Sequence, residues 1–218
     1  NLLYRSFTSA DVERLFSLYP ITNSIVSSVA NMEPAVINAL NRLSKRFVLF
    51  DHLTLLPIKN CYQTPETLGH DRIAAAVGAA HLCPNTNLLI IDAGSAVTYD
   101  FVSAEQGYLG GNIAPGIKMR LTALHQMTKR LPKVEVEPDA LTPLFGKNTK
   151  EAMAAGVVRG LVFEVKGYMR SLKEQKIVFR TYVTGGHAPY ILNAMKQKEV
   201  VGEPHLVLIG LNCILSGL

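Results

Sequence analysis

The chain has 218 residues, of which 48% are hydrophobic and 18% charged, and its mean hydropathy is +0.18. This is the composition of a globular protein with one large core or two small packed domains, and the lack of long apolar runs excludes a transmembrane span. Three well-separated cysteines, Cys61, Cys83 and Cys213, exclude a disulfide framework and a zinc site and indicate a cytoplasmic protein, while the net charge of +5 suits anionic substrates.

The first third of the chain alternates between helical and strand patterns. Apolar spacing predicts, in chain order, a helix at 11–19, a strand at 24–30, a helix at 33–45 and a strand at 46–50. An irregular stretch follows at 51–68, and the next helix begins near Asp71.

The start of that helix carries a possible acid–base group. Gly69 and His70 precede Asp71, and Arg72 follows it. A helix N-terminus and an arginine both favour an anion, so Asp71 could accept a proton from a substrate hydroxyl. The alternative is that Asp71 only caps the helix and Arg72 is a surface charge.

A hairpin is predicted next, from strands at 88–94 and 96–102. Its turn places Asp92 before Gly94 and Ser95, with Thr98 shortly after. Exposed turn amides and the two hydroxyls can hold phosphate oxygens, and Asp92 could hold a cation beside them. A plain hairpin turn is the alternative.

The remaining elements continue the alternation. We expect a non-helical glycine-rich segment at 107–116, a helix at 117–130, a long irregular lid or interface segment at 131–148, a helix at 149–173, a strand at 177–184, a helix at 187–198, a strand at 206–210 and a short helix at 211–217. Gly185 and Gly186 form a strand-to-helix turn that could lie against a nucleotide base or be a simple tight turn. The alternation predicts a mixed α/β sheet covered by helices.

The order of these turns resembles the superfamily of sugar kinases, heat-shock ATPases and actin. That resemblance implies α/β architecture with duplicated, ribonuclease H-like mixed-sheet domains flanked by helices. Residues 1–85 would be the N-terminal half, with acceptor-site elements, and 86–218 the C-terminal half, with the second phosphate hairpin and the adenosine turn.

Within that superfamily the chain resembles the type III pantothenate kinases. The motifs that carry the resemblance are Pro65-x-x-Leu68-Gly69-x-Asp71-Arg72 after Tyr62, Asp92-Ala93-Gly94-Ser95-Ala96 with Thr98-Tyr99-Asp100, Gly110-Gly111-x-Ile113-x-Pro115-Gly116, Gly146-x-x-Thr149 and Thr184-Gly185-Gly186-x-Ala188. The resemblance implies ATP-dependent phosphorylation of pantothenate to 4'-phosphopantothenate, the first step of coenzyme A biosynthesis. A different sugar-type kinase of the superfamily is the less favoured interpretation.

The resemblance also implies a role for each matching residue. Asp71 would be the proton acceptor and Asp92 would bind a monovalent cation, K+ or NH4+. Substrate binding is expected of Tyr62, Gly69, His70, Asp71, Arg72 and Thr149, the last from across a homodimer interface. ATP binding is expected of Ser95, Thr98, Gly185 and Gly186, with Mg2+ accompanying the ATP.

One family motif is absent from the sequence. The family begins with a strand that carries Asp-x-Gly-Asn-Thr, whereas this chain starts at Asn1-Leu2-Leu3-Tyr4 and contains no such motif. The first strands of the N-terminal domain are therefore expected to be missing, either because a short segment is omitted or because the protein is degenerate. The second case leads to the alternative function, a catalytically impaired regulatory or transcription accessory protein. Because the basic residues are scattered, neither nucleic acid nor a membrane is expected as a partner.

Overall fold

The structure, a computed structural model, describes residues 7–28, 32–137, 142–195 and 200–217. The start at Asn1–Tyr4 and the basic group at 196–198 lie outside these ranges. No helix in the described part of the chain is long and apolar enough to cross a membrane.

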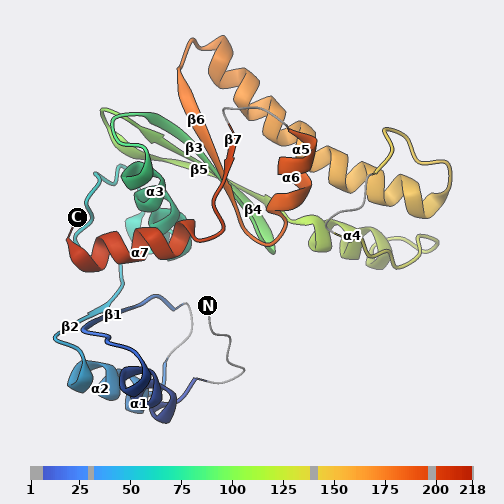
Figure 1. Cartoon of the computed structure of the whole chain (residues 1–218). Helices are drawn as coiled ribbons and strands as arrows, with labels where there is room; N and C mark the ends of the chain where they lie inside the picture. The colour runs from blue at the N-terminus through green and yellow to red at the C-terminus, as the bar shows by residue number, and fades with distance from the viewer. Residues whose placement is uncertain (1–6, 29–31, 138–141, 196–199, 218) are drawn as a thin grey trace.

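The N-terminal part of the described chain is a small α/β unit. It consists of α1 (Ser9–Leu18), β1 (Asn23–Val26), α2 (Pro34–Leu43) and β2 (Arg46–Leu49). The two strands pair in parallel, with Asn23 opposite Arg46. Its own small core contains Val12, Val36, Ala39 and Leu40. Figure 1 shows this unit at the lower left, below α7.

The larger sheet has the strand order β5-β4-β3-β6-β7. Its strands are β3 (Asn87–Ala93), β4 (Ala96–Ser103), β5 (Gly107–Pro115), β6 (Phe179–Thr184) and β7 (Val200–Gly202). The predicted β3–β4 hairpin is confirmed, β5 continues it as a meander, and β6 and β7 run parallel to β3 and β6 respectively. The sheet is therefore mixed, as the alternation predicted.

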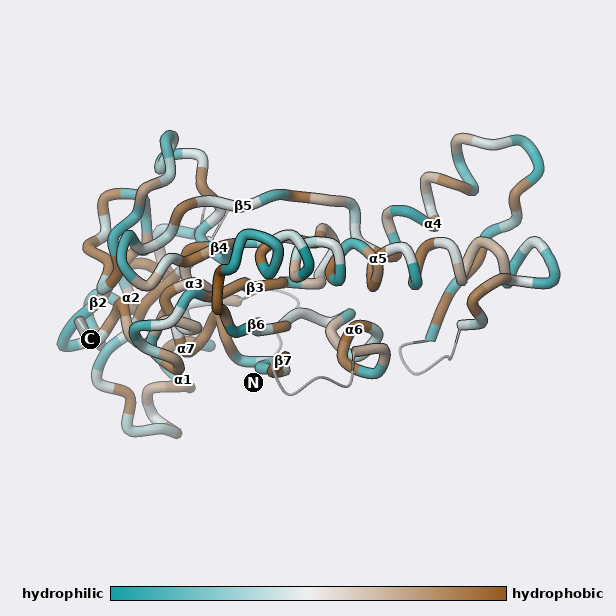
Figure 2. Tube along the Cα trace, turned by 90° about the horizontal axis from the view of Figure 1, so that it is seen from above, coloured by the Kyte–Doolittle hydropathy of each residue, from teal (hydrophilic) through white to brown (hydrophobic). Residues whose placement is uncertain are grey.

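Helices cover both faces of this sheet (Figure 1). On one side lie α3 (His70–Leu82), after the short 3-10 turn η1 (Pro65–Thr67), and α7 (Leu206–Ser216). On the other side lie α4 (Ile117–Gln126), α5 (Thr149–Glu174) and α6 (Ala188–Ala194). Because side chains alternate along a strand, each strand supplies both cores. In Figure 2 the tube of β3 is mostly hydrophobic, as expected of a central strand buried on both faces.

The strand predicted at 206–210 is wrong, because these residues form the first turns of α7. A short apolar run does not distinguish a strand from a buried helix. This helix packs closely against α3: a Cβ on Gly78 would collide with the Leu206 carbonyl, and one on Gly210 with the Ala74 carbonyl. Glycine at both positions lets the two helix backbones touch.

Candidate active site

Three glycine-containing turns meet at one end of the larger sheet. The His187 amide donates to the Ala93 carbonyl at 2.8 Å, which joins the turn after β6 to the turn after β3. The Gly116 amide donates to the Ser95 carbonyl at 3.1 Å, which joins the end of β5 to the same place. The turns that the sequence singled out separately are thus one structural unit.

Gly185 is required by this close approach. Its φ of +89° lies in the region that L-residues rarely adopt, and an added Cβ would collide with the Asp92 carboxylate and the Ala93 backbone. Gly186, by contrast, has open space where a Cβ would stand. The two glycines of the turn therefore have different structural roles.

Asp92 is flanked by hydroxyls on both neighbouring strands. It is the register partner of Thr98 on β4 and of Thr184 on β6, so the three side chains share one face of the sheet. Thr98 and Thr184 are buried, and the Thr98 hydroxyl has no hydrogen-bond partner among the described residues. These three side chains place a carboxylate and two hydroxyls, the oxygen groups that coordinate hard cations, side by side at the end of the strands.

The pKa of Asp92 is raised to about 6. Burial is the main cause, and the negative charges of Asp71 and Asp100 add to it. Asp71 on α3 and Asp100 on β4 therefore lie close enough for their charges to act on Asp92 on β3, although no group of three or more His, Cys, Asp or Glu in the described chain is arranged as a metal cluster.

Asp71 is exposed at the first turn of α3. One of its carboxylate oxygens accepts the backbone N–H of Arg72 at 2.9 Å. The side chain thus remains open to a ligand while its position is fixed by the helix start.

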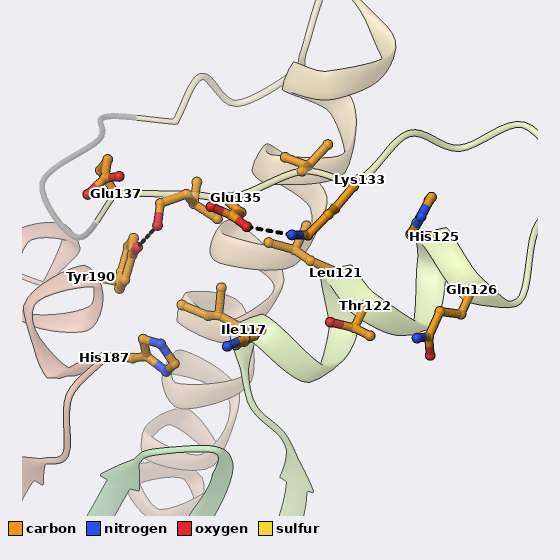
Figure 3. Close-up of a pocket in the computed structure, with 13 residues that line it drawn as sticks. Ile117, Leu121, Thr122, His125, Gln126, Lys133, Glu135, Glu137, His187 and Tyr190 are labelled. Carbon is orange, nitrogen blue, oxygen red and sulfur yellow. Dashed lines mark hydrogen bonds and ion pairs between the residues drawn. The ribbon is translucent and has the colours of Figure 1, made fainter.

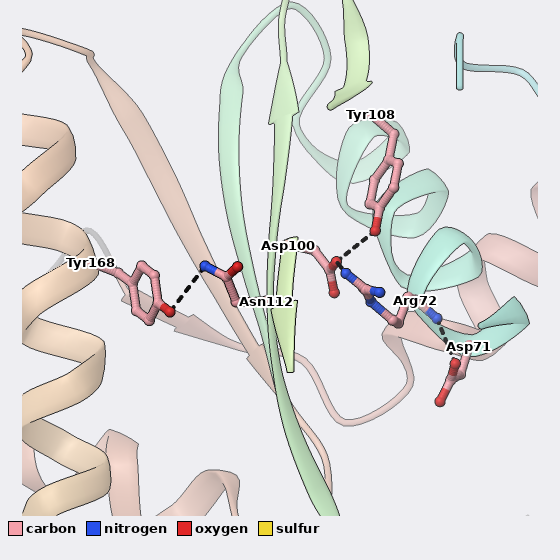
Figure 4. Close-up of polar contacts among 6 residues, drawn as sticks. All are labelled: Asp71, Arg72, Asp100, Tyr108, Asn112 and Tyr168. Carbon is pink, nitrogen blue, oxygen red and sulfur yellow. Dashed lines mark hydrogen bonds and ion pairs between the residues drawn. The ribbon is translucent and has the colours of Figure 1, made fainter. Parts of the chain in front are cut away.

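Arg72 is buried, so the interpretation of it as a surface charge is wrong. Its side chain is 6% exposed, and its Nε and Nη2 donate to Oδ1 of Asp100 at 3.0 and 2.6 Å. Tyr108 donates its hydroxyl to the same oxygen at 2.7 Å (Figure 4). Sequence reasoning gave Asp100 and Tyr108 no role, although alternation along β4 places Asp100 on the same face as Thr98.

Tyr62 and His70, two more residues that the resemblance assigns to substrate binding, lie near the start of α3. The Tyr62 ring lies 5.7 Å from the Arg72 guanidinium carbon and 6.1 Å from the Tyr108 ring. The His70 ring packs on Phe50 at 4.9 Å, with a buried Nδ1 that has no partner in the described chain. The structure therefore places Tyr62 by Arg72, whereas His70, the first residue of α3, packs on Phe50.

An open groove runs along α4 from the glycine turns. It consists of two adjoining hollows of about 480 and 450 Å³ that share Lys118, Thr122, Gln126 and His187. Ser95 lines the inner hollow, and Tyr190 with the 133–137 segment lines the outer one (Figure 3). Lys133 pairs with Glu135 at 2.9 Å above the groove, and Tyr190 donates to the Val136 carbonyl at 2.8 Å.

A second arginine supports the turn beside Ser95. Arg120 donates through Nη1 and Nη2 to Glu164 on α5 at 2.6 and 2.7 Å, and through Nε to the Pro115 carbonyl at 2.6 Å. Tyr99 adds its hydroxyl to Glu164 at 2.8 Å. This network links α4, α5 and the end of β5.

Thr149 is not brought to this site. It is exposed at the first residue of α5, after the cap Asn148. In Figures 1 and 2 this end of α5 lies on the right, whereas α3 lies on the left. Within one chain, the start of α5 therefore lies away from α3.

Comparison with known proteins matches the chain to the family model described as type III pantothenate kinase, over residues 5–171. A protein of that name from Phocaeicola vulgatus is 40% identical over 202 residues, which cover 93% of this chain and 82% of the relative. One from Bacteroides fragilis is 39% identical over 216 residues, covering 99% and 88%. A solved structure from Campylobacter jejuni, described as a proposed Baf family transcriptional activator, shares the fold with a TM-score of 0.60 at 22% identity, covering 94% of this chain and 87% of that one.

Proposed function

The chain belongs to the type III pantothenate kinase family, and we propose that it transfers the γ-phosphate of ATP to the primary hydroxyl of pantothenate. The product would be 4'-phosphopantothenate, in the first step of coenzyme A biosynthesis. The observation that carries the proposal is that Asp71, an exposed acid at a helix start, lies close enough to Asp92 at the glycine-turn end of the sheet for its charge to raise the pKa of Asp92. The curated relatives do not favour the alternative, an accessory protein without turnover.

Asp71 is the proposed general base. Phosphoryl transfer depends mainly on positioning and on stabilising charge, and a primary hydroxyl gains nucleophilicity when a carboxylate accepts its proton. Asp71 is exposed, and the dipole of α3 favours negative charge at its position. The hydroxyl proton would pass to the Asp71 oxygens as the bond between the pantothenate oxygen and the γ-phosphorus forms and the bond from that phosphorus to the bridging oxygen of ADP breaks.

Asp92 is the proposed ligand of a monovalent cation, K+ or NH4+. The residues present fit such an ion, since the carboxylate lies in register with two hydroxyls and the buried Thr98 oxygen has no other partner in the described chain. A bound cation would supply positive charge beside the phosphates. Burial of Asp92 without such an ion is costly, which supports a ligand role.

The nucleotide would occupy the turns and the groove along α4. Ser95 and Thr98 would approach the phosphates, and the Gly185–Gly186 turn would face adenosine. Lys118 and His187 line the groove close to Ser95, and Lys118 adds a positive charge for an anionic ligand. Mg2+ would arrive with the ATP.

The acceptor would bind on the α3 side. Gly69, His70 and Arg72 adjoin Asp71 along the chain, Tyr62 lies by Arg72, and Thr149 would come from a second copy. The position of Thr149, far from α3 in the same chain, supports a homodimer in which α5 of one subunit completes the site of the other. The duplicated, ribonuclease H-like division after residue 85, a cytoplasmic location and the absence of nucleic-acid or membrane partners belong to the same proposal.

The test is a turnover assay with ATP, Mg2+, K+ and pantothenate, with the product identified by mass spectrometry. We expect 4'-phosphopantothenate, a strong loss of rate when K+ is replaced by a large organic cation, and no product from glucose. Absence of product under these conditions would contradict the proposal, and a faster reaction with a sugar would assign the chain to another kinase of the superfamily.

A further inference from the structure

Asp100 has surroundings that stability alone does not explain. Its side chain is 1% exposed, on the central strand β4, and it faces a buried arginine. Replacing a buried ion pair with apolar groups is often neutral or stabilising, because desolvation offsets the attraction between the charges. One carboxylate oxygen nevertheless receives three hydrogen bonds, while the other is buried with no partner in the described chain.

The contacts of Asp100 lead directly to Asp71. Oδ1 of Asp100 binds the Arg72 side chain, and the Arg72 backbone N–H donates to the Asp71 carboxylate at 2.9 Å. The ion pair ties the first turn of α3 to the sheet, which fixes the rotation of the helix about its axis. Because Asp71 precedes Arg72, that rotation decides where the Asp71 carboxylate points.

The same pair also holds the ring that borders the acceptor side. Tyr62 lies 5.7 Å from the Arg72 guanidinium carbon, and Tyr108, which donates to Asp100, lies next to Tyr62. None of these contacts involves Ser95, Gly185 or the groove along α4. Loss of the Tyr108 hydroxyl, which leaves the Asp100 charge near Asp92 in place, should therefore be felt at the acceptor and not at the nucleotide.

We propose that Asp100 is a positioning residue for the acceptor, acting through Arg72 to hold Asp71 and Tyr62 in the geometry that phosphoryl transfer requires. This inference rests on the proposed function, since it needs a hydroxyl acceptor at Asp71. Tyr108 has a supporting role, because its hydroxyl holds the Asp100 oxygen that binds Arg72.

The experiment compares two hydroxyl deletions and one charge deletion. Tyr108→Phe removes the hydrogen bond to Asp100, and Tyr99→Phe is its matched control on the opposite face of the sheet, where the hydroxyl bonds to Glu164 instead. Asp100→Asn keeps the shape of the side chain and removes its charge. For each variant, kcat and KM are measured for pantothenate and for ATP, and thermal unfolding is recorded.

For Asp100→Asn we expect kcat/KM for pantothenate to fall by roughly 100-fold, because a displacement of about 1 Å at the reacting groups has that effect. Tyr108→Phe should show a smaller loss of the same kind, on the order of 10-fold, with KM for ATP within about twofold of wild type. Tyr99→Phe should leave the pantothenate parameters unchanged.

A rise in KM for ATP as large as the effect on pantothenate, or losses that follow the fraction of unfolded protein, would overturn the inference in favour of a purely structural role. If Asp100→Asn does not fold, Tyr108→Phe still decides, and wild-type pantothenate kinetics in that variant would contradict the inference. A wild-type protein without turnover would contradict the proposed function itself, so the two failures are distinguishable.

Discussion

The two sides of the site are built in different ways. On the α3 side, charged groups are buried: Arg72 and Asp100 are 6% and 1% exposed and are closed off by tyrosine rings. On the groove side, the corresponding ion pair of Arg120 and Glu164 is 18% and 38% exposed, and most of the close contacts are made by backbone turns. The α3 side is thus held in place by a buried ion pair, and the groove side by close contacts between backbone turns.

This difference matches what each substrate requires. The acceptor must place one hydroxyl against one carboxylate, and small displacements there reduce the rate strongly. The nucleotide has many polar atoms that turn amides and an open groove can contact. Substitutions that remove a charged group should therefore disrupt the α3 side most, and substitutions that replace a glycine should disrupt the groove side most.

The largest expected effect is on stability, from breaking the buried pair. Arg72→Met should lower the free energy of unfolding by about 3–5 kcal/mol, because it leaves the Asp100 carboxylate buried and unpaired. Arg120→Met, the matched change on the groove side, should cost only about 1 kcal/mol, since Glu164 can reach solvent. Urea denaturation of both variants measures the difference, and equal losses would remove the distinction between the two sides.

The next effect concerns the glycine turn. Gly185→Ala should cost about 2–4 kcal/mol, from a strained φ and a collision with Asp92, and should raise KM for ATP. Gly186→Ala is the control, because its Cβ meets nothing within 4 Å, and it should stay within about 0.5 kcal/mol of wild type. A Gly185→Ala variant with normal stability and normal ATP kinetics would show that the close approach is not needed.

A smaller effect is expected from pH. The pKa of Asp92 is about 6 in the folded protein against an ordinary value of 3.8, so the folded state holds the proton more tightly than the unfolded state. Relative to Asp92→Asn, the wild type in potassium-free buffer should therefore lose stability as the pH rises from about 4 to about 6, by about 2 kcal/mol after allowance for solvent screening.

Chemical denaturation of both proteins at several pH values tests this effect. Asp92→Asn should be the more stable protein at pH 7, and added K+ should reduce the difference by stabilising the ionised carboxylate. A wild type whose stability relative to Asp92→Asn does not change between pH 4 and 6 would contradict the burial of this charge.

The turns on the groove side could be predicted from the sequence, whereas the buried contacts on the α3 side could not. Glycine turns are local signals, so the turn between β3 and β4 and the turn at 185–186 could be placed from residue type and spacing. The partner of Arg72 could not, because Asp100 is 28 residues away and their contact depends on α3 packing across β4. Residues 206–210 could not be distinguished from a strand for a similar reason, because this apolar run is a helix whose packing partner, α3, lies far away in the sequence.

The central claim is that Asp71 accepts the proton of the substrate hydroxyl, and Asp71→Asn tests it most directly. Asparagine keeps the size of the side chain but is a far weaker base, so kcat should fall by about 10²–10⁴-fold. Pantothenate binding, measured by calorimetry on the same preparation, should stay within a few fold of wild type because the buried Arg72–Asp100 pair still holds the first turn of α3. Turnover at the wild-type rate in Asp71→Asn would contradict the account.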